Sequence, residues 1–259
     1  MKVCVLASGS KGNCTYIEND NYKIIIDCGI TYRNAFLKAE SVGIDLSNLD
    51  AIFITHEHGD HAKYLYQFYY RTKALIYIGK PTLNKLLKTN LSLKKVPEIL
   101  ILDPDFTYKI CDFEIIPIEL VHDVFCLGYF IKHNNKTILY ATDTGFFPNR
   151  YLELLQMANL LIIEANHDIE MLRESERPNY LINRVLSENG HMSNLSCYHL
   201  LSRNINANNS HIILAHVSED CNSEDIITTE IIDKLYSELN YIGEIHIAKQ
   251  RISSRVIKL

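Results

Sequence analysis

Five short runs of apolar or β-branched residues, each followed by an acid or a histidine, constrain this chain more than any other feature of its sequence. They are residues 24–26 before Asp27, 51–55 before His56, 138–142 before Asp143, 161–163 before Glu164 and 212–215 before His216. Continuous apolar runs are typical of strands buried on both faces, as in sheets that helices cover. Because binding sites in α/β proteins commonly form at strand ends, these side chains are expected to meet at one edge. The pattern predicts an α/β fold with mixed sheets and a polar site along that edge.

Helical patterns separate the strand-length runs without a linker or a repeat, so we expect a single domain over residues 1–259. Strands are expected at residues 2–7, 15–18, 22–27, 51–55, 74–78, 113–120, 125–132, 137–142, 160–164, 211–216, 244–248 and 254–258. Helices are expected at residues 61–70, 81–88, 151–156, 179–188, 194–203 and 224–239. So many short strands between helices favour a layered arrangement over a simple doubly wound sheet.

The strongest chemical signal is the motif HxHxDH at residues 56–61, directly after a predicted strand. On extended backbone His56 and His58 project to the same side and can chelate one ion. The glycine that follows allows a sharp turn, after which Asp60 and His61 can start a helix and face the same pocket. They could serve a second ion there. The spacing therefore predicts a metal centre.

This motif resembles the signature of the metallo-β-lactamase fold hydrolases, and further matches follow in order along the chain. They are an aspartate at a strand end (Asp27), a lone histidine after a strand (His122), an aspartate that opens a loop (Asp143) and a late histidine at a strand end (His216). The resemblance implies a four-layer αββα sandwich with mixed sheets. It also implies an enzyme, a metal-dependent hydrolase.

The resemblance further implies a site for two divalent metal ions. The ligands implied for one ion are His56, His58 and His122, those for the other are Asp60, His61 and His216, and Asp143 would bridge the two. Because this set has nitrogen and oxygen donors and no thiolate, it suits Zn²⁺, Mn²⁺ or Fe²⁺. Two such ions would activate water and clamp the oxygens of a phosphodiester, and Asp60 would orient the nucleophile. Asp27 would accept a hydrogen bond from a ligand imidazole.

Three further segments resemble the YycJ (WalJ) group of bacterial proteins within this fold. They are residues 6–14 (LASGSKGNC), 164–168 (EANHD) and 190–194 (GHMSN). That group is similar to the nuclease branch that contains tRNase Z and the β-CASP nucleases. The resemblance implies a 5′-to-3′ exonuclease that acts on double-stranded DNA. No inserted β-CASP domain and no long tRNA-binding arm interrupts the chain, which argues against tRNA processing.

In this resemblance His191 would be a catalytic acid that protonates the leaving oxygen, and Glu164 would orient it. The residues around His191 also form a helix-start pattern, where a capping or surface histidine would be ordinary.

Candidate substrate contacts are Ser8, Ser10 and Asn13 in the glycine-rich first loop, together with Ser193. The loop lacks the spacing of a phosphate-binding P-loop, so a tight hairpin between two strands is an equal alternative.

The charge distribution bears on the substrate. The net charge of −5 argues against non-specific nucleic-acid binding by bulk charge. Residues 62–97, however, contain eight basic and six aromatic side chains and no acid. Such a segment could line a groove for a polyanion with stackable bases. It could also be a solvated basic helix face whose aromatic residues pack into the core.

Two features bear on the cellular compartment. The first apolar run, residues 3–7, ends at Ser8-Gly9 and is too short for a signal-peptide core or a membrane helix. The seven cysteines form no CxxC pair, which argues against a disulfide framework and a thiolate zinc site. We therefore expect a cytoplasmic protein with no membrane segment.

Three functions compete at this stage. The first is a nucleic-acid phosphodiesterase, with double-stranded DNA as the expected partner. The second is a small-molecule metallohydrolase of the thioesterase or cyclic phosphodiesterase type, which would share the HxHxDH motif. The third is a metal-holding regulatory protein. The complete ligand set argues against the third, because a site freed from catalysis has no reason to keep an open two-metal geometry.

Overall fold

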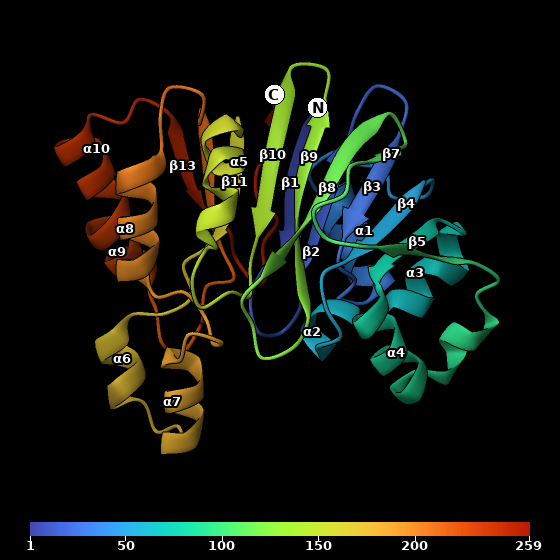
Figure 1. The fold of residues 1–259 in the computed structure, drawn as a ribbon, viewed down its shortest axis with the longest axis horizontal. Coiled ribbons are helices and arrows are strands. Elements are labelled where there is room, and N and C mark those ends of the chain that lie inside the picture. Colours follow the sequence, from blue (N-terminus) through green and yellow to red (C-terminus); the bar gives the residue numbers. More distant parts are fainter.

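The computed structural model describes residues 1–259 and places two seven-stranded sheets face to face (Figure 1). In spatial order the first sheet contains β14 (Ile257–Lys258), β1 (Lys2–Ala7), β2 (Cys14–Glu18), β3 (Lys23–Ile26), β4 (Ala51–Ile54), β5 (Leu75–Gly79) and β6 (Ile99–Leu102). The second contains β13 (Glu244–Ile247), β12 (His211–Ala215), β11 (Leu160–Glu164), β10 (Lys136–Ala141), β9 (Cys126–His133), β8 (Phe113–Leu120) and β7 (Tyr108–Ile110). Both sheets are mixed, as predicted. Strands β3 to β6 and strands β10 to β13 pair in parallel, and the other pairs are antiparallel.

Helices cover the outer face of each sheet. The first sheet carries α1 (Tyr32–Glu40), α3 (Leu65–Thr72) and α4 (Lys80–Thr89), and the second carries α5 (Leu152–Met157), α8 (Asn194–Asn204), α9 (Glu224–Ile227) and α10 (Asp233–Leu239) (Figure 1). The remaining elements are α2 (Gly59–Ala62), α6 (Ile169–Glu174), α7 (Asn179–Leu186), the 3-10 turns Leu91–Lys95 and Asn149–Tyr151, and a π turn at Thr228–Ile232. This layer order confirms the predicted αββα sandwich. No helix is both long and apolar enough to cross a membrane.

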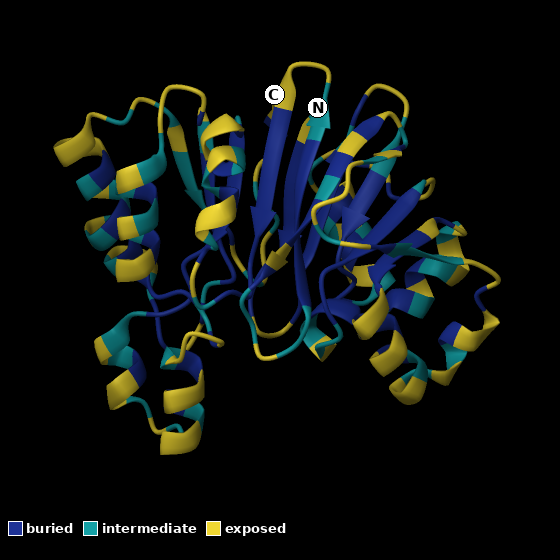
Figure 2. Cartoon of the chain, in the orientation of Figure 1, coloured by how far each residue is buried: buried dark blue, intermediate teal, exposed yellow.

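Neighbouring residues of the central strands enter different cores, because these strands are buried on both faces. In β3, Ile24 and Ile26 pack between the two sheets, whereas Ile25 packs in the core that contains α1 and α3. In β11, Leu160 faces the other sheet and Leu161 faces the helices outside the second sheet. Figure 2 shows the same pattern, with buried strands between helices that expose their outer sides. Burial on both faces is the physical reason for the continuous apolar runs.

Several elements differ from the sequence prediction. The pattern of apolar residues in the sequence did not predict α1, α6, β6 and β7. The helix predicted at residues 61–70 is interrupted between α2 and α3, where the amide of Tyr64 donates to the carbonyl of Cys28. The helix predicted at residues 224–239 contains the π turn at its centre. The strand predicted at residues 254–258 is shorter in the structure and consists of β14 alone. Before it, the Ser254 amide donates to the Val5 carbonyl, and the Ser254 hydroxyl accepts the Val5 N–H in place of a backbone carbonyl.

Candidate metal centre

The polar strand exits meet at one edge of the sandwich. Asp27 and His56 follow β3 and β4 of the first sheet, while Asp143 and His216 follow β10 and β12 of the second and Glu164 ends β11. At Asp27, Asp143 and His216 the backbone is left-handed, with φ values of 65°, 60° and 54°. Aspartate and histidine are among the few non-glycine residues that tolerate this conformation, which turns the chain sharply at the end of each strand. The same three residues thus end a strand and supply a polar side chain.

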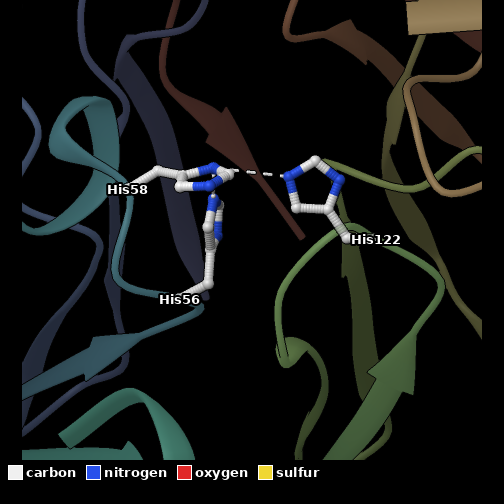
Figure 3. Close-up of side chains that lie close together, drawn as sticks. All are labelled: His56, His58 and His122. Atoms are coloured by element: carbon white, nitrogen blue, oxygen red, sulfur yellow. Dashed lines mark hydrogen bonds between the residues drawn. The ribbon is translucent and has the colours of Figure 1, made fainter. Parts of the chain in front are cut away.

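The first cluster consists of three imidazoles, His56, His58 and His122, whose rings point toward one another (Figure 3). Nε2 of His56 lies 3.0 Å from Nδ1 of His58, and Nε2 of His122 lies 3.4 Å from that same Nδ1. His122 follows β8, so this cluster draws on both sheets. Three imidazole nitrogens within 4.8 Å of one another could hold one transition-metal ion.

The second cluster combines carboxylates and imidazoles, namely Asp60, His61, Asp143 and His216. Nε2 of His61 lies 3.2 Å from Oδ2 of Asp143, and Nε2 of His216 lies 3.5 Å from Oδ2 of Asp60. Oδ2 of Asp143 and Nε2 of His216 are buried without a hydrogen-bond partner. Because buried polar atoms are nearly always paired, these two orphaned atoms fit a cation between them.

Four of the imidazoles have a hydrogen-bond partner at Nδ1, so Nε2 is the nitrogen that each ring could offer to a metal ion. The pairs are His61 with Asp27 at 2.7 Å, His216 with Glu164 at 2.7 Å, His56 with the hydroxyl of Thr55 at 2.9 Å and His122 with the carbonyl of Gly190 at 3.2 Å. A partner of this kind fixes the tautomer and the orientation of a metal-binding imidazole. Asp27 is itself fixed, because it accepts the N–H of Thr55 at 2.9 Å.

His191 joins the centre through Glu164. Its Nδ1 lies 2.9 Å from Oε1 of Glu164 and 3.8 Å from Oδ1 of Asp143. The other oxygen of Glu164 accepts the backbone N–H groups of Thr144 at 2.9 Å and Met192 at 3.2 Å. The buried carboxylate is therefore fixed from two directions and holds the His191 ring beside both clusters.

Two acids of the centre, Asp143 and Glu164, are held in their ionised form. Burial raises the pKa of Asp143, but His216 and His61 outweigh that effect and hold it well below its usual range. Burial likewise raises the pKa of Glu164, while His191 and other neighbours lower it to about 2. Ionised carboxylates are the form that binds metal ions.

The imidazoles divide into two groups. Burial lowers the pKa of His56 and His122, so both rings are neutral and ready to bind a metal. Burial also opposes a charge on His216, but Asp143 and other acids raise its pKa to about 10, and the pKa of His61 rises for the same reason. A cation bound at the second cluster would therefore displace protons from these two rings.

The glycine-rich first loop connects the antiparallel strands β1 and β2, so it is a hairpin loop. Ser10 is exposed in this loop, whereas Ser8 and Asn13 are buried. The Ser8 hydroxyl accepts the backbone N–H of His216 at 2.7 Å, and the Asn13 amide lies 2.9 Å from Nε2 of His61. Ser8 and Asn13 thus support the centre from within the chain.

Ser193 caps α8, because its hydroxyl accepts the backbone N–H of Ser196 at 3.2 Å. Sequence reasoning assigned no role to Asn166, whose amide donates to the carbonyl of His216 at 2.7 Å. Its position two residues after the strand-end Glu164 is the signal that could have placed it at the site.

A family model described as "Beta-lactamase superfamily domain" matches residues 22–216, a range that includes every cluster described above. The chain belongs to this superfamily, and it is a hydrolase of the metallo-β-lactamase fold whose clustered side chains suit divalent metal ions. It is 28% identical over 247 residues to the exodeoxyribonuclease YycJ of Bacillus anthracis, an alignment that covers 93% of this chain and 91% of that protein. It is also 28% identical over 243 residues to the exodeoxyribonuclease WalJ of Streptococcus pneumoniae, with 90% of this chain and 88% of that protein covered.

Solved structures agree on the fold. The metallo-β-lactamase fold protein YhfI from Bacillus subtilis superposes with a TM-score of 0.73 at 19% identity, covering 98% of this chain and 99% of that chain. The short form of human tRNase Z superposes with a TM-score of 0.65 at 16% identity, covering 100% of both chains. At these identities the likeness shows the shared architecture.

Proposed function

We propose that this protein is a dinuclear metal-dependent phosphodiesterase, a 5′-to-3′ exonuclease that acts on double-stranded DNA. The observation that carries the proposal is the position of His191, which Glu164 holds through Nδ1 beside two metal-binding clusters. A hydrolase that expels a poor leaving group needs such a proton donor, whereas one that expels a thiolate does not. The names of the two exodeoxyribonucleases that resemble the chain support a nucleic-acid substrate.

Two clusters divide the metal ligands in this proposal. One ion would be held by His56, His58 and His122, the other by Asp60, His61 and His216, with Asp143 between them. Two divalent ions, Zn²⁺, Mn²⁺ or Fe²⁺, would supply Lewis-acid stabilisation of the phosphate charge and a water molecule of lowered pKa.

The chain's own side chains then position the reactants. Asp60 is partly exposed and lies at the second cluster, where its carboxylate can accept a hydrogen bond from the attacking water and orient it. His191 is 19% exposed at its side chain, and the bond from Nδ1 to Glu164 leaves its Nε2 for the departing oxygen. Hydrogen bonds to Glu164 already fix the orientation of the His191 ring and of the neighbouring His216 ring.

The acid-free segment, residues 62–97, supports an anionic polymer as the substrate. All eight of its basic side chains are exposed, and none forms an ion pair or a side-chain hydrogen bond. Phe68 and Tyr77 are buried in the cores, whereas Tyr70 is 60% exposed and its ring could stack on a base. Exposed cations without an ion-pair partner attract phosphates and release their counterions.

A direct test is to load the metal-free protein separately with Mn²⁺, Zn²⁺ and Fe²⁺ and supply end-labelled duplex DNA, single-stranded DNA and RNA. We expect mononucleotides to be released progressively from the 5′ end of the duplex, with slower release from the other polymers. Hydrolysis of a cyclic phosphodiester or a thioester with no cleavage of any polymer would overturn the proposal in favour of a small-molecule hydrolase.

A further inference from the structure

A cavity of about 380 Å³ opens beside His191, outside the two metal-binding clusters. Its walls come from the loop after β10 (Phe146), the segment after β11 (His167), α6 (Ile169), the end of α7 (Leu186) and the start of α8 (Ser193). Pockets of this size suit small organic ligands. Since His191 is also one of its walls, whatever occupies the cavity lies next to the proposed proton donor.

His167 gives the cavity a hydrogen-bonding preference. It is 1% exposed, and a short parallel bridge to Ser193 fixes its backbone beside the His191 loop. The amide nitrogen of Asn166 donates to the carbonyl of His216, so the Asn166 oxygen faces Nδ1 of His167 at 3.3 Å and accepts a hydrogen bond from its N–H. Nε2 of His167 is then a bare acceptor, and it is buried with no partner in the chain.

The remaining walls favour a flat apolar group over a phosphate. Phe146 is 44% exposed and contributes aromatic surface, while Ile169 and Leu186 add aliphatic surface. No lysine or arginine lines the cavity, and Glu188 contributes an acid. An anion would meet this acid and the lone pair of His167, whereas the amino or imino N–H of a nucleobase would satisfy that lone pair.

We propose that this cavity receives the nucleobase of the nucleoside whose oxygen leaves, with the base stacked on Phe146 and donating to Nε2 of His167. The inference rests on the proposed function, because His191 identifies the side from which the leaving oxygen departs. We take water to attack the first phosphodiester and to break its bond to the 3′ oxygen of the 5′-terminal nucleoside, so the nucleoside that leaves is the terminal one and the remaining strand keeps the phosphate. The cavity would thereby recognise a free end one nucleotide at a time.

The test compares duplex DNA with a normal 5′-terminal nucleotide and the same duplex with an abasic 5′-terminal residue. We expect the normal end to be cleaved with a kcat/KM higher by about 5- to 150-fold, the usual worth of one base stacked on an aromatic side chain. Phe146→Ala and His167→Leu should each reduce this preference and leave cleavage of the abasic end unchanged. Phe106→Ala is the control, because Phe106 is 64% exposed and lies outside the cavity.

Binding of deoxyadenosine, measured by NMR titration of the full chain without DNA, separates this inference from the proposed function. Saturable binding that Phe146→Ala weakens and Phe106→Ala does not would support the cavity even in a protein that cleaves no DNA. Equal cleavage of normal and abasic ends by an active nuclease would overturn the inference and leave the proposed function standing. Displacement of deoxyadenosine by inorganic phosphate alone would also overturn it, because the cavity would then be an anion site.

Discussion

Replacing His191 by alanine should remove proton delivery and leave the metal centre in place. Glu164 loses one partner in this variant but keeps Nδ1 of His216 at 2.7 Å and the backbone N–H groups of Thr144 and Met192. The buried carboxylate thus remains satisfied, and His216 keeps its orientation. A positioned general acid contributes about 10²- to 10⁴-fold, so kcat on DNA should fall by that factor, which corresponds to about 2.7–5.4 kcal/mol of activation free energy.

The assay compares duplex DNA with bis(p-nitrophenyl) phosphate, since a leaving group of low pKa needs little help from an acid. His191→Ala should retain both metal equivalents by elemental analysis and lose less than about tenfold on the chromogenic diester. His199→Ala is the matched control, because His199 is an exposed histidine on the neighbouring helix α8 and should behave as the wild type. Equal losses on both substrates, or the loss of a metal ion, would refute the assignment of His191 as the acid.

Three further outcomes follow from the geometry. His58→Ala removes one nitrogen of the first cluster, so elemental analysis should find about one metal equivalent missing. In Asp143→Ala more than one equivalent should be missing. Two full equivalents in Asp143→Ala would exclude a bridging role for Asp143. Charge reversal of four exposed lysines of the acid-free segment should weaken DNA binding in a filter-binding assay and flatten its salt dependence. Hydrolysis of the chromogenic diester should not change. Equal losses of DNA binding and of diester hydrolysis would mean that the segment is structural. The residues to change to glutamate are Lys85, Lys88, Lys94 and Lys95. Tyr129→Phe should lower the free energy of unfolding in urea by about 1–3 kcal/mol, because its hydroxyl donates to the buried carbonyl of Ile54 at 2.6 Å; an unchanged midpoint would mean that water or a shifted neighbour satisfies that carbonyl.

The strands that carry the site could be predicted because their burial leaves a mark in the sequence. Ile24 to Ile26 face two cores at once, so every position is apolar, and the first polar residue marks the strand exit. Helix α1 left a weaker mark, since its exposed residues interrupt the pattern and only Ala35 and Ala39 are fully buried. The break between α2 and α3 has no signal in the sequence, because it is caused by a tertiary hydrogen bond from the Tyr64 amide to a distant carbonyl.

The candidate site likewise contains residues that the sequence predicted and contacts that it could not predict. The HxHxDH spacing places four side chains together by local geometry alone, and the resemblance to known hydrolases supplied the rest of the set. The supporting contacts are long-range. Ser8 and His216 are 208 residues apart, and the orphaned Nε2 of His167 becomes visible only when the whole environment is known. Sequence patterns report which residues are near in the chain or alike in burial, but they do not report which polar atoms lack a partner.

At Asp27, Asp143 and His216 the left-handed backbone lowers the stability of the fold, while the side chain is needed at the candidate metal centre. This conformation costs an L-amino acid roughly 1–2 kcal/mol, and a glycine would adopt it without strain. Glycine would also delete a candidate ligand or the carboxylate that steers one. The substitutions that best relax these three turns are therefore among those that most damage the centre. A laboratory selection for heat resistance that ignored activity would therefore favour replacing these strand-end residues of the centre by glycine.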